Sequence, residues 1–391
     1  MSLVKSVTAL FLEKFKVQPL LFRSPGRVNL IGEHTDYNMG YVLPAAIDKA
    51  ILFAITPRSD RQCHVYAMDM NDEHEFSLDD LRSSKKGWPN YLMGVVDQFV
   101  KAKYSIRGFN CVFGGDIPIG AGMSSSAAIE AGLAFALNSM FNLQIDALSL
   151  VKLAQKAENE FVGVRCGIMD QYINIFGKQD NVLRIDCRSL EYHYYPFAFN
   201  TISLVLFNTQ VAHSLASSEY NRRREECGEG VEVLKKTYPD VRYLRDVTVD
   251  MLQTCKHQMN ETIYRRCKYV VEENDRVLQA CGELEKGNLR TFGRLMKETH
   301  LGLSRDYEVS CKELDFLVEQ LQDNPHVYGS RMMGGGFGGC TINLIENTYI
   351  EQISKSVAEK YKHRFNIDLK TYITTIGSGT HRIKTKEHAA V

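Results

Sequence analysis

The chain has 391 residues, which is long enough for two domains and a sizeable hydrophobic core. Apolar residues make up 44% and charged residues 24%, as in an ordinary globular protein. The 47 basic and 47 acidic residues cancel, which argues against a general binder of nucleic acid or of acidic membranes. The sequence has no run of 18 apolar residues, and residues 1–18 lack the apolar core of a signal peptide. We therefore expect a cytoplasmic protein that binds neither nucleic acid nor membranes.

The ten cysteines are scattered along the chain. They form no C-x-x-C pair and no Cys/His cluster, so the sequence predicts neither a zinc site nor a redox pair. Reduced and mostly buried thiols are the expectation for a cytoplasmic protein. For Cys166 we expect a structural role rather than a nucleophilic one.

In chain order, residues 1–18 are predicted to form an amphipathic helix, and residues 27–31 a strand that follows the Pro25-Gly26 turn. Gly32 ends this strand, and five polar residues follow it at positions 33–37. Carboxylates beside a histidine suit the recognition of a polyol, because each sugar hydroxyl both donates and accepts a hydrogen bond. A polar surface turn is the alternative, but apolar segments on both sides favour a site at the end of a sheet.

Residues 109–141 read as a strand, a glycine-rich turn and a helix. The turn contains four glycines and the three serines at 124–126, which stand where residues that cap a helix belong. Free amides at a helix N-terminus bind phosphate, so this turn predicts a phosphate-binding loop rather than an ordinary cap. It is not a Walker A loop, since no lysine lies between residues 108 and 149, and Ser125 replaces the third glycine of a G-x-G-x-x-G pattern.

Residues 147–161 are predicted to form a helix with Glu158 near its end, and residues 166–171 open a second helix after Gly163. Asp170 has two interpretations at this helix start. It is either a partner of the helix dipole, worth about 0.3–1 kcal/mol, or a catalytic carboxylate. From the residues alone the structural role is favoured.

Farther along, a domain boundary is predicted near Pro196, and the arginine run at 222–224 is interpreted as a solvated helix face. Helices are predicted at 262–286, 288–302, 313–322 and 352–363, with strands at 182–186, 202–207, 340–344 and 370–375. The five glycines at 334–339 predict a close backbone approach, either to a ligand or to the other domain. The tail from Gly377 is expected to be disordered or exposed.

Three motifs resemble those of the GHMP small-molecule kinase family in order and spacing, and together they span most of the chain. They are PGRVNLIGEH at 25–34, PIGAGMSSSA at 118–127 and GGGFGGC at 334–340. The sequences GRVNLIGEHTDYN at 26–38 and CGIMDQ at 166–171 resemble the members that phosphorylate galactose. The resemblance implies an α+β fold with an N-terminal domain that contains a left-handed β-α-β element, a ferredoxin-like C-terminal domain, and an active site in the cleft between them. We place the two domains at residues 1–200 and 201–391.

The resemblance also implies an enzyme that transfers the γ-phosphoryl group of ATP to O1 of galactose, giving galactose 1-phosphate and ADP. Asp170 matches the catalytic aspartate that contacts O1, and Arg27 matches the arginine that keeps it ionised. Six residues match sugar-binding positions: Glu33, His34, Thr35, Asp36, Gly167 and Tyr220. Seven match the ATP phosphate loop: Gly120, Ala121, Gly122, Met123, Ser124, Ser125 and Ser126. Ser126 and Glu158 match ligands of Mg²⁺, a hard cation that prefers such oxygens.

Departures from the family pattern are small. Ala121 replaces a glycine and Met123 a leucine, both of which suit the loop, and Met333 puts in doubt a hydroxyl contact before the third motif. One alternative is a kinase for N-acetylgalactosamine or L-arabinose, against which Thr35 and Asn38 argue. Another is a non-catalytic sensor of galactose and ATP, against which the complete serine loop argues. We expect a monomer or a weak homo-oligomer.

Overall fold

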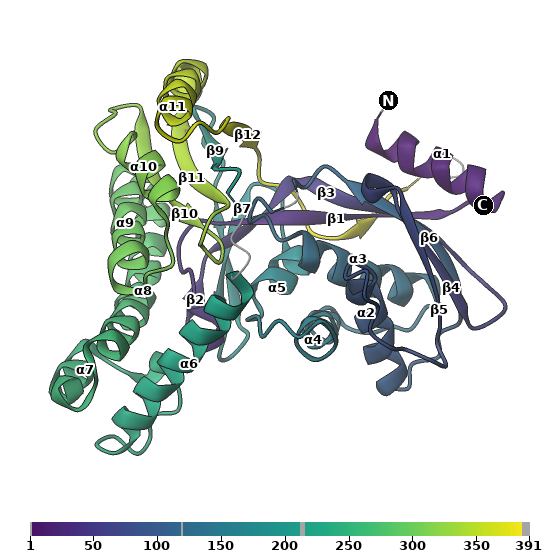
Figure 1. Ribbon diagram of the computed structural model, residues 1–391, viewed down its shortest axis with the longest axis horizontal. Helices are drawn as coiled ribbons and strands as arrows, with labels where there is room; N and C mark the ends of the chain where they lie inside the picture. The colour runs from purple at the N-terminus through teal and green to yellow at the C-terminus, as the bar shows by residue number, and fades with distance from the viewer. Residues whose placement is uncertain (1, 119, 212–215, 385–391) are drawn as a thin grey trace.

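The computed structural model describes residues 2–118, 120–211 and 216–384. Figure 1 shows two parts side by side, each organised around its own sheet. The N-terminal part contains a six-stranded sheet of order β13-β1-β3-β6-β4-β5. Its strands are β1 (Leu20–Asn29), β3 (Pro44–Pro57), β4 (Gln62–Ala67), β5 (Asp72–Ser77), β6 (Phe109–Gly115) and β13 (His381–Arg382). All neighbouring strands are antiparallel except β4 and β6, which are parallel.

Both faces of this sheet are covered, so β3 is a nearly continuous apolar run. Leu52 and Ala54 pack with the predicted N-terminal helix, α1 (Leu3–Phe15). Phe53 faces the opposite side, where it joins the largest core cluster together with α2 (Pro89–Lys101) and α3 (Ser125–Met140). Because side chains alternate along a strand, the helices on the two faces of the sheet pack against alternate residues of β3.

A small three-stranded sheet lies beside the first and positions the helix that carries Asp170. It contains β2 (Tyr41–Val42), β7 (Asn181–Asp186) and β8 (Tyr192–Pro196). Helices α4 (Ala147–Lys156) and α5 (Met169–Phe176) pack against it through one apolar cluster. The predicted helix at 147–161 continues past α4 as a π-helical segment, Ala157–Val162, which Gly163 ends with a φ of 91°. Such segments often occur at functional sites, and this one carries Glu158.

The C-terminal part contains a four-stranded antiparallel sheet of order β10-β11-β9-β12. Its strands are β9 (Ile202–Asn208), β10 (Val327–Met333), β11 (Cys340–Glu346) and β12 (Lys370–Thr374). The long helices α8 (Glu261–Glu285) and α9 (Leu289–Leu301) cover one face, while α10 (Lys312–Glu319) and α11 (Ile350–Phe365) cover the other. Helices α6 (Ala216–Lys235) and α7 (Val249–Cys255) extend this part away from its sheet (Figure 1).

Of the two alternatives predicted for the tail from Gly377, disorder is wrong for residues 377–384, whereas exposure is confirmed for Ser378, His381, Arg382 and Lys384. The Gly377 amide donates to the Ala46 carbonyl at 2.9 Å, and the Gly379 amide donates to the Gly177 carbonyl at 2.8 Å. Strand β13 then pairs with β1. Residues 385–391 lie outside the described residues. The chain therefore returns to its first sheet after completing the C-terminal part, while the domain division at residue 200 stays a prediction.

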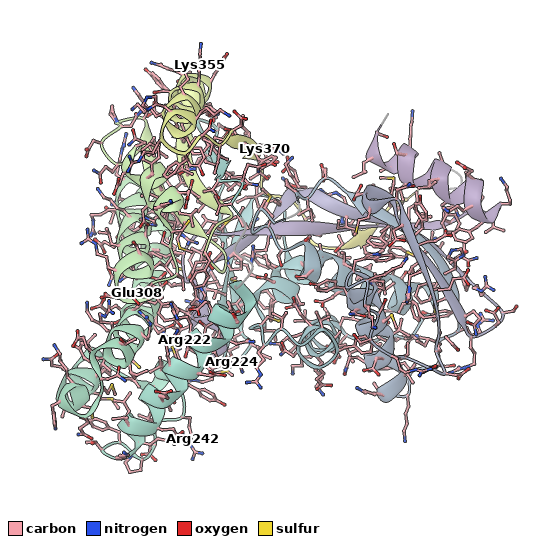
Figure 2. All side chains as sticks on the ribbon, viewed as in Figure 1. Arg222, Arg224, Arg242, Glu308, Lys355 and Lys370 are labelled. Atoms are coloured by element: carbon pink, nitrogen blue, oxygen red, sulfur yellow. The ribbon has the colours of Figure 1, made fainter. Side chains whose placement is uncertain are left out.

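The arginine run is only partly a solvated face. Arg222 and Arg224 lie on the exposed side of α6 (Figure 2), whereas the Arg223 side chain is only 6% exposed and is held by acidic and carbonyl oxygens. All ten cysteines are free thiols, and all except Cys166 and Cys311 are buried. No described helix combines the length and the apolar composition that a membrane-spanning segment needs.

Candidate active site

A cavity of about 240 Å³ lies where the end of β1, the start of α5, helix α6 and the loop after β10 meet. It brings together residues from the first and third sequence motifs and from the CGIMDQ segment. Its lining consists of Arg27, Glu33, His34, Asp36, Glu158, Val164, Cys166, Gly167, Met169, Asp170, Tyr220 and Gly334–Gly336. For eight of these residues, the family resemblance predicts a role in catalysis, in sugar binding or in metal binding.

Arg27 and Asp170 form a bidentate ion pair at the base of this cavity. The Nε and Nη2 atoms of Arg27 donate to Oδ1 and Oδ2 of Asp170, both at 2.8 Å. The Ser124 hydroxyl donates to the same Oδ2 at 2.5 Å. Burial alone would lower the pKa of Arg27, but the nearby charges of Asp170 and Glu33 outweigh it and raise that pKa above its ordinary value. Arg27 therefore stays cationic, and its planar guanidinium holds both oxygens of Asp170.

The glycine-rich loop contacts this pair through its backbone. The Gly122 carbonyl accepts from Nη1 of Arg27, and the Met123 carbonyl accepts from the Arg27 amide at 3.1 Å. Gly120 and Gly122 have φ angles of 73° and 71°, which glycine adopts without strain. The Ala121 and Met123 side chains are buried in the core instead of facing the cavity.

Ser124 stands at the N-cap of α3, as the sequence predicts, but its side chain does not cap the helix. This residue precedes α3 with a φ of 58°, and its hydroxyl makes no capping bond because it is committed to Asp170. Helix α3 begins at Ser125, so the amides of Ser125 and Ser126 lie in its first turn, where they lack helical partners. Ile119 of the second motif lies outside the described residues.

The third glycine motif lies directly against the loop of the second. A Cβ atom on Gly334 would be 3.5 Å from the Gly122 carbonyl oxygen, and one on Gly339 would be 3.7 Å from that of Gly120. Gly334–Gly336 also line the cavity. The two alternatives left open for this motif, contact with a ligand and contact with the other domain, are therefore compatible with each other.

A group of buried carboxyl side chains lies next to the glycine-rich loop at residues 120–126. Glu158 accepts from the Gln171 amide at 2.7 Å and from the Cys166 thiol at 3.1 Å, and the Ser126 hydroxyl also donates to it. Burial raises the pKa of Glu158, and the charge of Asp170 acts in the same direction. Burial likewise raises the pKa of Glu130, with the charge of Glu158 as the next cause.

These carboxyl side chains fit a Mg²⁺ ion that is shared with a nucleotide better than they fit a cation held by protein ligands alone. Among the described residues, no three His, Cys, Asp or Glu side chains are grouped as a protein-only metal site requires. Mg²⁺ bound to a nucleotide keeps water and phosphate ligands and takes only one or two protein oxygens. The Ser126 hydroxyl and the Glu158 carboxylate are such oxygens, and a cation would offset both the burial of the Glu158 charge, which is the main cause of its raised pKa, and its repulsion by Asp170.

The turn at residues 33–36 is buried, and residues of helix α8 hold it in place through hydrogen bonds. The Tyr269 hydroxyl donates to the Glu33 carbonyl at 2.9 Å, and Glu273 accepts from the Gly32 amide at 2.7 Å. The Glu33 carboxylate accepts from the Gly334 amide at 2.7 Å and from Arg331 at 3.1 Å, in both cases through Oε1. Glu33 of the first motif is thus hydrogen bonded to the third glycine motif without a ligand.

His34 and Asp36 project from this turn into the cavity. His34 has a φ of 61°, and burial lowers its pKa to about 4, so the imidazole is neutral at pH 7. Burial raises the pKa of Asp36 to about 6, with the charge of Asp170 as the next cause. Gly167 permits the position of Asp36, because a Cβ atom there would lie 1.8 Å from Oδ2 of that carboxylate. The Tyr220 ring lies 5.2 Å from the His34 ring.

Thr35 does not line the cavity. It is fully buried, and its hydroxyl lies 2.6 Å from the Tyr41 carbonyl and 2.9 Å from the Gly32 carbonyl, both of which can only accept. Thr35 therefore differs from the other five residues predicted to bind the sugar, all of which line the cavity.

Sequence reasoning missed several residues that support the site, namely Glu130, Gln171, Tyr269, Glu273, Tyr307 and Arg331. None carries a local signal except Gln171, which belongs to the CGIMDQ segment. The others lie on elements far away in the chain, and a buried charged residue such as Glu273 looks like any other helix residue in the sequence.

Comparison with protein-family models identifies three matching regions. The galactokinase galactose-binding signature matches residues 9–57, which include Arg27 and the turn at 33–36. The N-terminal domain of GHMP kinases matches residues 90–178, and the C-terminal domain of GHMP kinases matches residues 280–363. The three regions together contain every motif described above.

Whole-chain comparisons agree with these matches. The chain is 43% identical to a galactokinase of Roseiflexus sp. (strain RS-1) over 374 residues, which is 95% of each chain. It is 41% identical to a galactokinase of Bacillus subtilis (strain 168) over 368 residues, 93% of this chain and 94% of that one. The crystal structure of Lactococcus lactis galactokinase complexed with galactose matches with a TM-score of 0.94 and 34% identity, covering 98% of this chain and 100% of that one.

Proposed function

Because the chain belongs to the galactokinase family of GHMP kinases, we propose that its cavity binds galactose and that Arg27 and Asp170 promote the transfer of the γ-phosphoryl group of ATP to O1. The chain is an ATP-dependent sugar kinase that phosphorylates galactose. The observation that carries the residue assignment is the bidentate Arg27–Asp170 pair, which joins the sugar cavity to the phosphate loop.

The hydrogen bonds of Asp170 indicate which of its oxygens serves the substrate. Oδ2 accepts from both Arg27 and Ser124, whereas Oδ1 accepts only from Arg27 among the described residues. A carboxylate oxygen has two acceptor sites, so Oδ1 keeps one free. We assign Oδ1 as the atom that orients the O1 hydroxyl of galactose and accepts its proton as the phosphoryl group is transferred.

The remaining assignments follow from charge and geometry. Arg27 offsets negative charge that develops on the transferring group, and phosphoryl transfer depends mainly on such positioning and neutralisation. The first amides of α3 and the backbone of residues 120–124 face the phosphates of ATP. Ser126 and Glu158 would hold Mg²⁺, which supplies positive charge to the phosphate oxygens when bound. Glu33, His34, Asp36, Gly167 and Tyr220 form the sugar pocket.

We also infer that the protein acts in a reducing compartment such as the cytoplasm, as a monomer or weak homo-oligomer. Ten unpaired cysteines support the compartment, since thiols persist where glutathione keeps them reduced. Mass measured by light scattering at several protein concentrations tests the oligomeric state.

A panel of sugars at fixed ATP and Mg²⁺ tests the substrate, with the product identified by ³¹P NMR. We expect galactose to give a sugar 1-phosphate with the highest kcat/KM of the panel. Faster turnover of N-acetylgalactosamine or L-arabinose would reassign the substrate within the same family. Binding of galactose and ATP without any product would instead indicate a sensor.

A further inference from the structure

His34 is surrounded by three tyrosine rings and is hydrogen bonded through both ring nitrogens. Its ring centre lies 5.8 Å from that of Tyr37, 5.2 Å from that of Tyr220 and 5.0 Å from that of Tyr307. Nδ1 lies 2.7 Å from the Tyr37 hydroxyl, and Nε2 lies 3.2 Å from the Gly335 carbonyl oxygen. Tyr37 and Tyr307 do not line the cavity, so neither is placed to touch a sugar.

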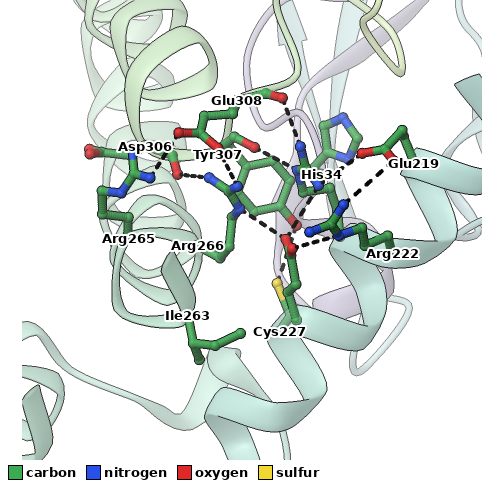
Figure 3. A network of polar contacts seen from close by, with 12 residues as sticks. His34, Glu219, Arg222, Cys227, Ile263, Arg265, Arg266, Asp306, Tyr307 and Glu308 are labelled. Atoms are coloured by element: carbon green, nitrogen blue, oxygen red, sulfur yellow. Dashed lines mark hydrogen bonds and ion pairs between the residues drawn. The ribbon is translucent and has the colours of Figure 1, made fainter. Parts of the chain in front are cut away.

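The contacts continue inward from Tyr37 to a helix of the C-terminal part. The hydroxyl oxygens of Tyr37 and Tyr307 lie 2.7 Å apart, and the Tyr307 hydroxyl lies 3.2 Å from the Cys227 thiol on α6. All three side chains are buried. Figure 3 shows Tyr307 close to both His34 and Cys227.

The direction of each hydrogen bond follows from the groups at its ends. A carbonyl oxygen only accepts, so Nε2 of His34 carries the proton that points to Gly335. The imidazole is neutral at pH 7, because burial lowers its pKa to about 4, and Nδ1 must therefore accept from Tyr37. The single proton of Tyr37 is then in use, so its oxygen accepts from Tyr307, and the Tyr307 oxygen accepts from the Cys227 thiol. Every proton in this relay of Cys227, Tyr307, Tyr37 and His34 points the same way.

Two buried arginines hold the backbone around Tyr307. Arg223 of α6 donates to the Tyr307 carbonyl at 2.7 Å and to the Glu308 carbonyl at 2.8 Å. Arg266 of α8 donates to the Asp306 carbonyl and to the Glu308 carboxylate, both at 2.5 Å. Figure 3 shows Arg266 beside Asp306 and Glu308, the neighbours of Tyr307 in the chain. The Tyr307 hydroxyl thus extends from a fixed backbone.

We propose that Tyr37 and Tyr307 are positioning residues that hold His34 in the Nε2–H tautomer, so that the imidazole offers galactose a hydrogen-bond donor and not an acceptor. This inference rests on the proposed function for the identity of the sugar, but not for the tautomer. The Nε2–H donates to the Gly335 carbonyl at 3.2 Å in the ligand-free protein, and both residues line the cavity, so a sugar oxygen that enters there shares this donor with that carbonyl. The neighbouring carboxylates of Glu33 and Asp36 supply acceptors, and a hydroxyl needs both kinds of partner.

The test combines the tautomer of His34 with the kinetics of Tyr37→Phe and Tyr307→Phe. The matched control is Tyr361→Phe, which also deletes one buried hydroxyl, hydrogen bonded to the Thr209 carbonyl at 2.9 Å. ¹⁵N NMR of the ligand-free protein distinguishes the two tautomers, and loss of one signal in His34→Gln assigns His34 among the eleven histidines. The melting temperature of each variant reports its stability.

We expect the wild-type protein to show the Nε2–H tautomer at pH 7. Tyr37→Phe should weaken that preference, because only the Gly335 carbonyl then favours it, and should raise the KM for galactose by about tenfold, the size of one net hydrogen bond, with kcat and the KM for ATP nearly unchanged. Tyr307→Phe should raise the KM for galactose only about two- to threefold, because Tyr37 still donates to His34. This order of effects separates a relay from a general loss of stability.

Two results would overturn the proposal. One is the Nδ1–H tautomer of His34 in the wild-type protein. The other is a galactose KM in Tyr37→Phe no higher than in Tyr361→Phe. If Tyr37→Phe fails to fold, the spectrum of the wild-type protein and the kinetics of Tyr307→Phe still decide. If another sugar proves to be the substrate, the proposed function fails, while the tautomer measured without ligand still tests the relay.

Discussion

The turn at residues 33–36 and the glycine-rich loop at residues 120–126 both lie beside the Arg27–Asp170 pair, but they are held in different ways. The turn is completely buried, and Glu33, Thr35 and Asp36 each form hydrogen bonds within the protein. The loop is more exposed, and only Ala121 and Met123 anchor it in the core. We conclude that the turn, the proposed sugar side of the site, is formed in advance, whereas the loop, the proposed phosphate side, leaves backbone amides of its helix start available for a ligand. Changes to the sugar side should therefore alter sugar recognition, and changes near the phosphate loop should alter turnover and the metal requirement.

The largest expected effect is that of Asp170→Asn on turnover. The substitution is nearly isosteric, but an amide cannot accept the O1 proton, and general-base help is worth about 10²–10⁴-fold. We expect kcat to fall within this range, while the galactose Kd and the melting temperature change little. Steady-state kinetics and calorimetric titration with galactose measure the two quantities separately.

The double variant with Arg27→Lys serves as the control for Asp170→Asn. Lysine keeps the charge but loses the planar fork that holds both oxygens of Asp170. Each residue acts partly through the other, so the effects of the two substitutions on kcat should not add. Turnover near the wild-type value in Asp170→Asn would remove Asp170 from the mechanism and leave it as a helix-start residue.

The next largest effect is expected for Gly167→Ala, which tests the rigidity of the sugar side. The new Cβ atom would lie 1.8 Å from Oδ2 of Asp36, so this carboxylate must move. A displacement of about 1 Å in a site can cost about 10²-fold, and we expect the galactose KM to rise by that order while the KM for ATP stays unchanged.

A matched control for Gly167→Ala is Gly282→Ala on α8, where an added Cβ atom meets no atom within 4 Å. It should leave both KM values unchanged. A normal galactose KM in Gly167→Ala would show that the turn adapts to the added atom, which contradicts a pocket formed in advance.

Glu158→Gln should have a smaller effect, confined to the phosphate side. The amide keeps the shape of the side chain but removes one charge from a site with few protein ligands for Mg²⁺. We expect the Mg²⁺ concentration for half-maximal activity to rise about tenfold, the lower end of the loss expected when a metal site is altered, with the galactose Kd unchanged. Glu160→Gln, in the same π-helical segment but exposed, is the control. Equal Mg²⁺ titrations for the two variants would rule out Glu158 as a ligand.

The smallest effect is a pH dependence of galactose binding. Burial raises the pKa of Asp36 to about 6, so lowering the pH through 6 protonates this carboxylate in the folded protein and removes an acceptor for a sugar hydroxyl. Galactose affinity should fall a few-fold between pH 7 and pH 5, and the dependence should be weaker in Asp36→Asn. His34 does not titrate in this range, since its pKa is about 4. Affinity that stays constant from pH 7 to pH 5 would contradict the buried position of Asp36.

Asp36 also makes stability depend on pH, with the opposite sign. Its folded pKa of about 6 lies above its ordinary value of 3.8, so the folded state holds this proton more tightly than the unfolded state. The contribution of Asp36 to the free energy of unfolding is fully present below pH 3.8 and is lost as the pH rises through 6. Comparing the unfolding free energies of wild type and Asp36→Asn across this range isolates it.

Much of the site could be predicted because its residues lie in short motifs with a local physical meaning. Glycines before a serine-rich helix start indicate a phosphate loop, and a strand that ends in carboxylates beside His34 indicates polyol binding. The residues alone left Asp170 as a helix-start residue, because its role depends on Arg27, which lies 143 positions away. Only the resemblance to a kinase family supplied that pairing.

The parts that could not be predicted depend on contacts between distant segments. Tyr307 meets Tyr37 across 270 positions, and no local pattern marks Tyr307, although Tyr37 lies in the motif at 26–38. Arg223 resembles its solvated neighbours in sequence but is buried against the backbone at Tyr307. The order of the tail at residues 377–384 could not be predicted, because its partner, strand β1, lies at the other end of the chain.

A crystal structure with galactose, a non-hydrolysable ATP analogue and Mg²⁺ tests the central claim most directly. We predict that the O1 hydroxyl lies about 2.6–3.2 Å from Oδ1 of Asp170, in hydrogen-bond contact with its free acceptor site. The backbone of residues 33–36 should keep its present position, and the phosphates should lie at the first turn of α3. A sugar bound with O1 turned away from Asp170, or a turn at 33–36 that rearranges to receive it, would contradict the account.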